Sequence, residues 1–192
     1  MGQHLASSIS NQASKMKDLS VIIVSFNTED LLKKCLLSVY RFTSGLDYEV
    51  IVVDNASRDG SVQLIKDEFK AVVLIENKQN RGFSAANNQA LRVARGNAVV
   101  LLNSDTELAD NSLKILHDFL FSRSVAGACG GLLVYPGGAP QWSYGYYPSL
   151  CRMLWVTLSG LLRINKGRKP NAVIPDQRKD PRQVEYIVGA DL

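Results

Sequence analysis

The sequence predicts an α/β fold, a single domain built around a mainly parallel central sheet. Two observations carry this prediction. Short apolar runs of strand length recur along the chain, and each ends in polar turn residues that lead into a stretch with apolar residues at helical spacing. Strands that alternate with helices in this way are typical of parallel sheets, because parallel neighbours need a crossover connection. At 192 residues the chain is long enough for one domain with a substantial core.

The expected elements follow one another in regular order. Strands are predicted at 21–24, 50–53, 72–75 and 98–102. The helices that follow them are predicted from apolar stripes at 31–39, 62–69, 84–95 and 113–120. We expect Asn27 to cap the first helix and Gly96 to close the third. A Gly-rich strand is expected at 127–135, and the turn residues 136–138 would return the chain as a hairpin arm at 141–144.

The composition is ordinary for a soluble globular protein, with 46% hydrophobic residues, 21% charged residues and a net charge of +4. Much of the positive charge lies within 163–182, and it lacks the interleaved aromatic residues of a nucleic-acid-binding module. We therefore expect no nucleic acid partner. Residues 1–18 lack the apolar core of a signal peptide, which predicts a disordered leader, a domain over 19–192 and a cytoplasmic protein.

The cysteines and histidines do not suggest a zinc site. Cys35, Cys129 and Cys151 are widely spaced among apolar neighbours and form no C-x-x-C pair. His4 lies in the leader and His117 in a predicted helix, so no histidine cluster accompanies them. We interpret the cysteines as reduced core residues.

Polar residues follow three of the predicted strands where each strand ends. Asn27, Asp54 and Asp105 occupy these positions, and Asp105 lies in the polar cluster that ends the apolar run at 98–102. The carboxyl ends of parallel strands meet at one edge of the sheet, where ligands bind in open α/β folds. Asp105 could there share a divalent cation with a bound diphosphate. The alternative is that Asn and Asp merely start turns, as these residues commonly do.

Four motifs then resemble a known family. They are VIIVSFN at 21–27, VDNASRDGS at 53–61, NRGFSAANN at 80–88 and LLNSDTE at 101–107. Their order and approximate spacing resemble those of the family 2 glycosyltransferases, most closely the rhamnosyltransferase-like branch that builds bacterial surface polysaccharides. The resemblance implies a single Rossmann-like nucleotide-diphospho-sugar transferase domain, the glycosyltransferase A fold, that uses a nucleotide-diphosphate sugar with Mg²⁺ or Mn²⁺.

The resemblance also implies roles for the residues at the ends of the first two strands. Ser25 and Asn27 would line the nucleoside pocket. Asp54 would accept a hydrogen bond from the imide N–H of a pyrimidine base, and a carboxylate suits that donor on uracil or thymine. The choice between UDP and dTDP stays open.

The resemblance also implies roles for Arg81, Asn103 and Asp105. Arg81 would lie near the phosphates as a basic residue. Asn103 and Asp105 stand in the place of the D-x-D signature of the family, with asparagine replacing its first aspartate. Asp105 would then be the metal ligand, and Asn103 would line the donor site.

By resemblance, the protein would transfer the sugar from a UDP- or dTDP-sugar, dTDP-rhamnose among the candidates, to a hydroxyl of a polysaccharide or lipid-linked glycan. The cation would stabilise the departing diphosphate, and a carboxylate base opposite it would give inversion. In the family this base follows a strand that resembles 184–191, so we expect it beyond Leu192 and assign no catalytic residue. Asp191 would contact a phosphate or the acceptor, or simply end a strand.

The segment 150–164 is apolar but too short to span a bilayer, and Arg152 and Arg163 interrupt it. It could make a peripheral contact with the inner face of the membrane, where a lipid-linked acceptor would lie, or pack on the sheet as an ordinary helix.

Two further functional classes remain to be weighed. One is a non-catalytic nucleotide-sugar-binding module or truncated paralogue, which the expected absence of the base favours. The other is a phosphoryl-accepting signalling domain at Asp54, but the turn at 25–27 supplies none of the further carboxylates that such a site needs for Mg²⁺. A dinucleotide-dependent dehydrogenase is disfavoured because no G-x-G-x-x-G turn follows the first strand.

Overall fold

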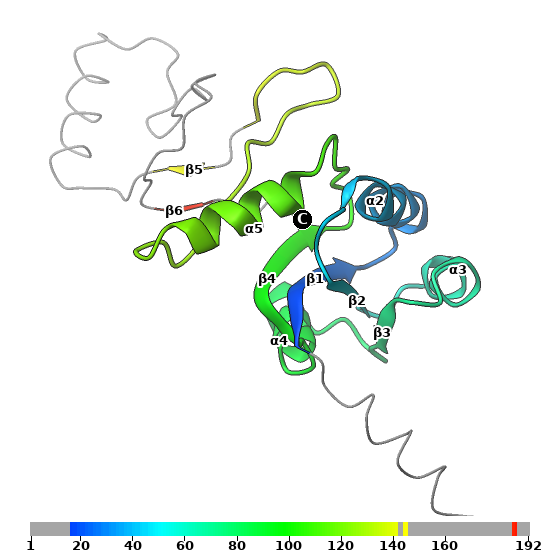
Figure 1. Cartoon of the computed structure of the whole chain (residues 1–192). Helices are drawn as coiled ribbons and strands as arrows, with labels where there is room; N and C mark the ends of the chain where they lie inside the picture. The colour runs from blue at the N-terminus through cyan, green and yellow to red at the C-terminus, as the bar shows by residue number, and fades with distance from the viewer. Residues whose placement is uncertain (1–15, 142–143, 146–185, 188–192) are drawn as a thin grey trace, which may run out of the picture. The chain divides into compact units, whose positions relative to one another are not determined.

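The computed structural model describes residues 16–141, 144–145 and 186–187 (Figure 1). The chain divides into two units, 1–123 and 124–192, and each is described by itself. The predicted contact segment 150–164, Cys151, His4 and Asp191 lie outside the described residues.

The first unit is a parallel four-stranded sheet with strand order β3-β2-β1-β4, which confirms the predicted α/β class. Its strands are β1 (Lys17–Ser25), β2 (Tyr48–Asp54), β3 (Val73–Glu76) and β4 (Gly96–Asn103). Its helices are α2 (Glu29–Phe42), α3 (Ser61–Glu68), α4 (Phe83–Leu91) and α5 (Ser112–Ser122). The register pairs Ser25 with Asp54 and Val24 with Asn103, so these strand ends lie at one edge.

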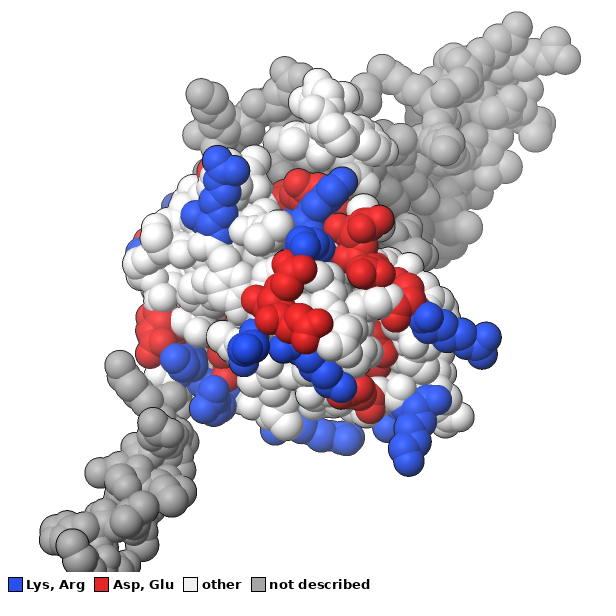
Figure 2. Space-filling view, turned by 90° about the vertical axis from the view of Figure 1, so that its right-hand side faces the viewer, with Lys and Arg blue, Asp and Glu red and all other residues white. Residues whose placement is uncertain are grey.

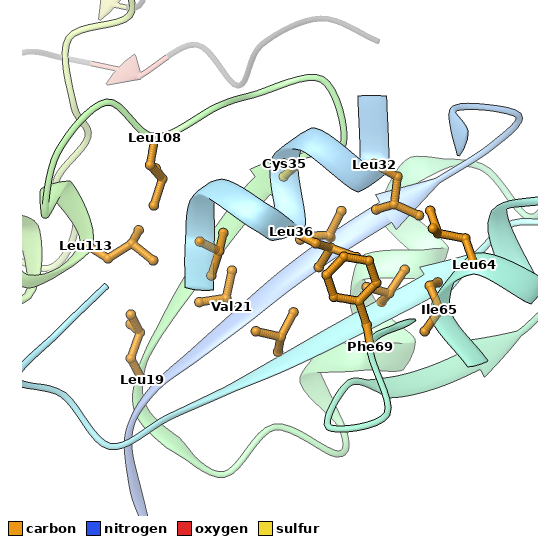
Figure 3. Close-up of a cluster of buried hydrophobic side chains, with 14 residues drawn as sticks. Leu19, Val21, Leu32, Cys35, Leu36, Leu64, Ile65, Phe69, Leu108 and Leu113 are labelled. Atoms are coloured by element: carbon orange, nitrogen blue, oxygen red, sulfur yellow. The ribbon is translucent and has the colours of Figure 1, made fainter. Parts of the chain in front are cut away.

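Helices cover both faces of the central strands, which explains their unbroken apolar sequences. On one face, the buried side chains of α2 and α3 form one apolar cluster with the odd-numbered residues of β1 and with Val50 and Val52 of β2. Figure 3 labels Leu36, Ile65 and Val21 among them. On the other face, Ile22 and Ile51 pack with residues of α4. The α4 residues at this contact include Ala86 and Ala90, both 0% exposed, whose small side chains let the helix approach the sheet closely.

The exposed surface of α2 and α3 carries both signs of charge. Figure 2 shows acidic and basic side chains interspersed on the face that it presents. Two surface ion pairs join these helices to their neighbours, Lys33 with Glu68 at 2.7 Å and Lys66 with Glu76 at 2.8 Å. Pairs this exposed contribute little to stability.

Two predicted boundaries at the amino edge of the sheet are wrong. β1 begins at Lys17, inside the predicted leader, because Lys17 N–H donates to Arg95 O and Asp18 N–H to Asp47 O. α4 ends at Leu91, so Gly96 does not close it but begins β4. A Cβ at Gly96 would lie 2.3 Å from Ser20 N, so only glycine allows the two strands to approach this closely.

In the second unit the predicted turn is confirmed and the predicted strand is not. Val134 forms an isolated antiparallel bridge with Pro140, and Gln141 N–H donates to Leu133 O, with the turn between them. Residues 127–133 form no strand, since a glycine-rich segment loses much entropy when it is extended. β5 (Tyr144–Gly145) and β6 (Tyr186–Ile187) pair antiparallel. Within the part of the chain that is described, no helix is both long and apolar enough to cross a membrane.

Candidate functional site

The candidate site lies at the carboxyl edge of the sheet, where β1, β2 and β4 end side by side. Ser25, Asp54 and Asn103 are 0%, 2% and 7% exposed, so polar side chains are buried here beside the apolar core. Asn55 N–H donates to Ser25 O at 2.8 Å and extends the pairing of β1 with β2 past the strand end. The predicted convergence of three strand ends is thus confirmed for β1, β2 and β4.

At this edge, Asp54 uses only one of its two carboxylate oxygens in a hydrogen bond within the described residues. Its Oδ2 accepts a hydrogen bond from Ser57 N–H at 3.0 Å. Its Oδ1 is buried and has no hydrogen-bond partner among the described residues. Leaving a buried charged oxygen without a donor is unfavourable, and each such group calls for an explanation. A ligand that brings an N–H or O–H donor to this oxygen would remove the penalty.

Asn27 locks the two loops that follow β1 and β2. It adopts a positive φ of 55°, its Oδ1 accepts from Arg58 N–H at 2.7 Å, and its N–H donates to Ser57 Oγ at 2.9 Å. Asparagine tolerates this left-handed conformation better than most residues. Asn27 therefore sets the shape of the site's rim through both its backbone and its side chain.

The prediction that Asn27 caps α2 is wrong. The cap position is Thr28, whose side chain makes no capping bond, and the first helical N–H, that of Glu29, donates to Asp59 Oδ2 at 3.0 Å. Glu29 Oε2 in turn accepts from Gly60 N–H at 3.0 Å. Burial would raise the pKa of Asp59, but the hydrogen bonds from Ser61 and Glu29 lower it below its usual value. A carboxylate from the second loop thus replaces the local cap.

Three hydroxyl groups connect the end of β1 to the end of β4. Ser25 Oγ and Thr28 Oγ1 share a hydrogen bond at 3.0 Å, and Thr28 Oγ1 donates to Ser104 Oγ at 3.2 Å. Ser104 is 1% exposed and directly precedes Asp105. The loop that carries Asp105 is therefore tied to the loop that carries Asn27.

Asp105 itself is exposed, at a turn closed by Thr106 N–H donating to Asn103 O at 3.1 Å. The same carbonyl accepts a hydrogen bond from Cys35 Sγ at 3.5 Å, so a residue of α2 helps to hold the turn. Burial first, and then the negative charges of Asp105 and Glu107, raise the pKa of Cys35 to about 12. The thiol stays protonated and acts as a donor, which confirms Cys35 as a reduced core cysteine.

Arg81 lies on a loop that side-chain amides fasten to the end of β2. Asn55 Oδ1 accepts from Arg81 N–H at 2.9 Å, and Asn55 Nδ2 donates to Asn80 Oδ1 at 2.8 Å. Asn77 also donates to Asn55 Oδ1, at 3.2 Å. The sequence analysis assigned no role to Asn55 or Asn80, although both lie within the quoted motifs, and it did not single out Asn77. An asparagine directly after a strand or before a Gly turn is too common to reveal such contacts by itself.

The described residues contain no group of three or more His, Cys, Asp or Glu that could hold a metal ion. Asp105 offers one exposed carboxylate, with Glu107 two residues further on. Mg²⁺ is often held by one or two carboxylates and by the phosphates of a substrate. This donor set fits a cation that a bound diphosphate helps to hold, and it does not fit a preformed protein cage.

Comparison with known proteins identifies the family. The sequence profile described as "Glycosyl transferase family 2" matches residues 20–176. The chain belongs to this family. The four motifs from which the family was inferred all lie within the matched residues.

Two relatives illustrate the sequence similarity of this family 2 chain. The poly(ribitol-phosphate) beta-glucosyltransferase of Bacillus spizizenii is 33% identical over 53% of this chain and 17% of its own length. The poly(ribitol-phosphate) beta-N-acetylglucosaminyltransferase TarP of Staphylococcus aureus is 32% identical over 54% of this chain and 33% of its own length. The alignments thus span a third or less of these relatives.

A solved structure supports the fold. Residues 1–349 of S. aureus TarS, in complex with UDP, align with a TM-score of 0.50 and 26% identity over 55% of this family 2 chain and 32% of that chain. The same protein in complex with UDP-GlcNAc aligns with the same TM-score and identity. The glycosyltransferase A fold expected from the resemblance is therefore shown, whereas the rhamnosyltransferase-like branch stays a prediction.

Proposed function

We propose that this chain binds a nucleoside-diphosphate sugar at the carboxyl edge of its sheet, as the donor-binding part of an inverting, metal-dependent glycosyltransferase. One observation carries the proposal, the buried Oδ1 of Asp54 that has no donor among the described residues. The imide N–H of uracil or thymine is a donor of the right kind, and a charged acceptor strengthens such a bond. The UDP bound to S. aureus TarS favours a pyrimidine nucleotide here as well.

The remaining edge residues are assigned by what surrounds them. Ser25 and Asn27 form the wall of the nucleoside pocket, since Ser25 pairs with Asp54 in the sheet and Asn27 holds together the loops that follow β1 and β2. Asn103 and Asp105 lie at the end of β4, next to β1. Arg81, exposed on a loop attached to the end of β2, is free to meet a phosphate.

Asp105 would hold Mg²⁺ or Mn²⁺ together with the donor diphosphate. When bound, the cation supplies stabilisation of the negative charge on the departing diphosphate. Arg81 would bring a second positive charge to the same phosphates, and preorganised charges of this kind are a large part of catalysis. The acceptor hydroxyl needs a base on the opposite side of the sugar, and this role stays with the acidic motif expected after 184–191.

We propose a hydroxyl of a cell-surface polysaccharide or lipid-linked glycan as the acceptor. The two relatives above are named for transfer to poly(ribitol-phosphate), a polymer rich in hydroxyl groups. The sugar and the branch of the family, with rhamnosyl transfer among the candidates, are part of the proposal. The titration below distinguishes UDP from dTDP as the nucleotide.

The test is calorimetric titration of the 192-residue chain with UDP, dTDP, GDP and NAD, each with and without Mn²⁺. We expect UDP or dTDP to bind in a metal-dependent way. Asp54→Asn and Asp105→Asn should each weaken that binding by roughly tenfold or more, because each removes a charged interaction with the ligand. Asp67→Asn serves as the matched control, since Asp67 is exposed on α3 and pairs with Gln63.

Equal binding by Asp54→Asn and the unmodified chain would contradict the proposed base contact. Preference for NAD, or no nucleotide binding at all, would contradict the donor site as a whole. In a chain extended to include the acidic motif expected after 184–191, nucleotide-sugar binding without transfer to any acceptor would favour the alternative, a non-catalytic nucleotide-sugar-binding module.

A further inference from the structure

Asn55 is a buried carboxamide that uses both ends of its side chain on one loop. It is 2% exposed and directly follows Asp54. Its Oδ1 accepts from the backbone N–H of Arg81 at 2.9 Å and from Asn77 Nδ2 at 3.2 Å, and its Nδ2 donates to Asn80 Oδ1 at 2.8 Å. All three contacts go to the loop 77–82, which lies more than twenty residues further along the chain.

The same loop is braced on its other side. Asn80 Oδ1 also accepts from Gly82 N–H at 2.8 Å, and Gly82 adopts a positive φ of 78°. Asn77 and Gln89 of α4 exchange two hydrogen bonds, each of 2.9 Å. Arg81 is therefore held at its backbone while its side chain is exposed. A flexible side chain on a fixed backbone point can reach only a limited volume, which makes its encounter with a ligand group more favourable.

We propose that Asn55 is a positioning residue for the donor diphosphate: it fixes the Arg81 loop to the strand end that carries Asp54. This inference rests on the proposed function, in which Asp54 binds the base and Arg81 meets the phosphates. The dipeptide Asp54-Asn55 then serves both parts of one ligand, the base directly through Asp54 and the phosphates indirectly through Asn55. The distance between the base contact at Asp54 and the phosphate contact at Arg81 is then set by the hydrogen bonds of the Asn55 side chain as well as by the covalent chain.

The experiment separates phosphate binding from base binding. Titrations of uridine and of UDP with Mn²⁺ are compared for the unmodified chain, Asn55→Ala, Arg81→Ala and the double variant. We expect Asn55→Ala to lower the affinity for UDP by roughly tenfold and the affinity for uridine by less than about twofold. The double variant should bind UDP no more weakly than whichever single variant loses more UDP affinity. This lack of additivity is what coupling through one loop predicts, and general destabilisation would not produce it.

Asn87→Ala is the matched control. Asn87 is also a buried carboxamide, 5% exposed, but it donates within α4 to Phe83 O at 3.0 Å and does not hold the Arg81 loop. Its loss should lower thermal stability without changing the ratio of UDP to uridine affinity. If Asn55→Ala does not fold, Asn80→Ala removes the other end of the same bond from an exposed position and should show the same selective loss.

An equal loss of uridine and UDP affinity in Asn55→Ala or Asn80→Ala would overturn the inference and leave the proposed function standing. Strict additivity with Arg81→Ala would overturn it in the same way. Failure of the unmodified chain to bind either ligand would overturn the proposed function, and the positioning role with it.

Discussion

Strand β2 carries a buried carboxylate near each end, and their surroundings differ in one decisive respect. Glu49, 8% exposed at the amino edge of the sheet, has both oxygens occupied. Its Oε1 accepts from Ser20 Oγ at 2.7 Å and Arg95 N–H at 2.6 Å, and its Oε2 accepts two bonds from the Arg95 guanidinium. Asp54, 2% exposed at the carboxyl edge, leaves Oδ1 without a donor among the described residues.

Under the proposed function, this difference separates a carboxylate that serves the fold, Glu49, from one that serves a ligand, Asp54. Where a sheet edge only needs to be closed, the chain supplies every donor itself, as Ser20 and Arg95 do. Where a ligand is to bind, one acceptor stays open and the unbound protein bears the penalty. The comparison predicts that Glu49 matters for stability and Asp54 for binding.

The largest expected effect on stability is that of Glu49→Ala. Removing the carboxylate takes away the acceptor of Arg95 N–H, of the Arg95 guanidinium and of the Ser20 hydroxyl at the amino edge. We expect a loss of about 2–3 kcal/mol in the free energy of unfolding, less than for a fully buried pair because the Arg95 side chain is half-exposed. Urea denaturation measures this loss, and a change comparable to that of Asp54→Asn would break the comparison.

Glu49→Gln tests the role of the same carboxylate through the pH dependence of stability, and it leaves no cavity because glutamine has nearly the same size. Burial would raise the pKa of Glu49, but the hydrogen bonds from Ser20 and Arg95 and the charge of Arg95 together lower it. A carboxyl group with a lowered pKa stabilises the fold above its unfolded pKa, and this contribution is lost as pH falls through the folded value. Glu49→Gln should therefore flatten the loss of stability below about pH 4, measured by urea denaturation at several pH values.

Gly96→Ala tests how tightly the amino edge is closed. The added Cβ would lie 2.3 Å from Ser20 N and 2.6 Å from Ala98 O, so backbone atoms would have to move. We expect a loss of roughly 2 kcal/mol in thermal or urea unfolding. Gly127→Ala is the control, because a Cβ there has no neighbour within 4 Å and no positive φ opposes it. Equal stability of the two variants would mean that the edge is looser than the strand pairing indicates.

Asp54→Asn should change stability little, by about 1 kcal/mol or less, in either direction. Only Oδ2 of this carboxylate is bonded within the described chain, and asparagine can still accept from Ser57 N–H. The same variant is expected to lose nucleotide affinity, so one substitution separates the two roles. Urea denaturation alongside the titration checks both, and a large destabilisation would show that Asp54 serves the fold after all.

The sheet and the convergence of its strand ends could be predicted because their causes are local. Apolar runs such as Val21–Val24 reveal strands buried on both faces, and parallel order then brings Asn27, Asp54 and Asp105 to one edge. What the sequence did not reveal depends on partners far apart along the chain. The bond of Asp59 to Glu29 N–H spans 30 positions and that of Asn55 to Arg81 N–H spans 26. No periodic pattern encodes such contacts, and asparagine and aspartate are common in turns whether or not they form them.

The smallest effect concerns Cys35, which also lies near the carboxyl edge but has a structural role there. Burial and the charges of Asp105 and Glu107 raise its pKa to about 12, so the thiol stays protonated at pH 8 and reacts slowly. We expect iodoacetamide to label Cys129, which is partly exposed, well before Cys35, and urea to remove the difference. Peptide mass mapping reads out both sites. Rapid labelling of Cys35 in the folded chain would mean that the Cys35 thiol leaves the Asn103 carbonyl and that the turn carrying Asp105 opens. The carboxyl edge would then be mobile before any ligand binds.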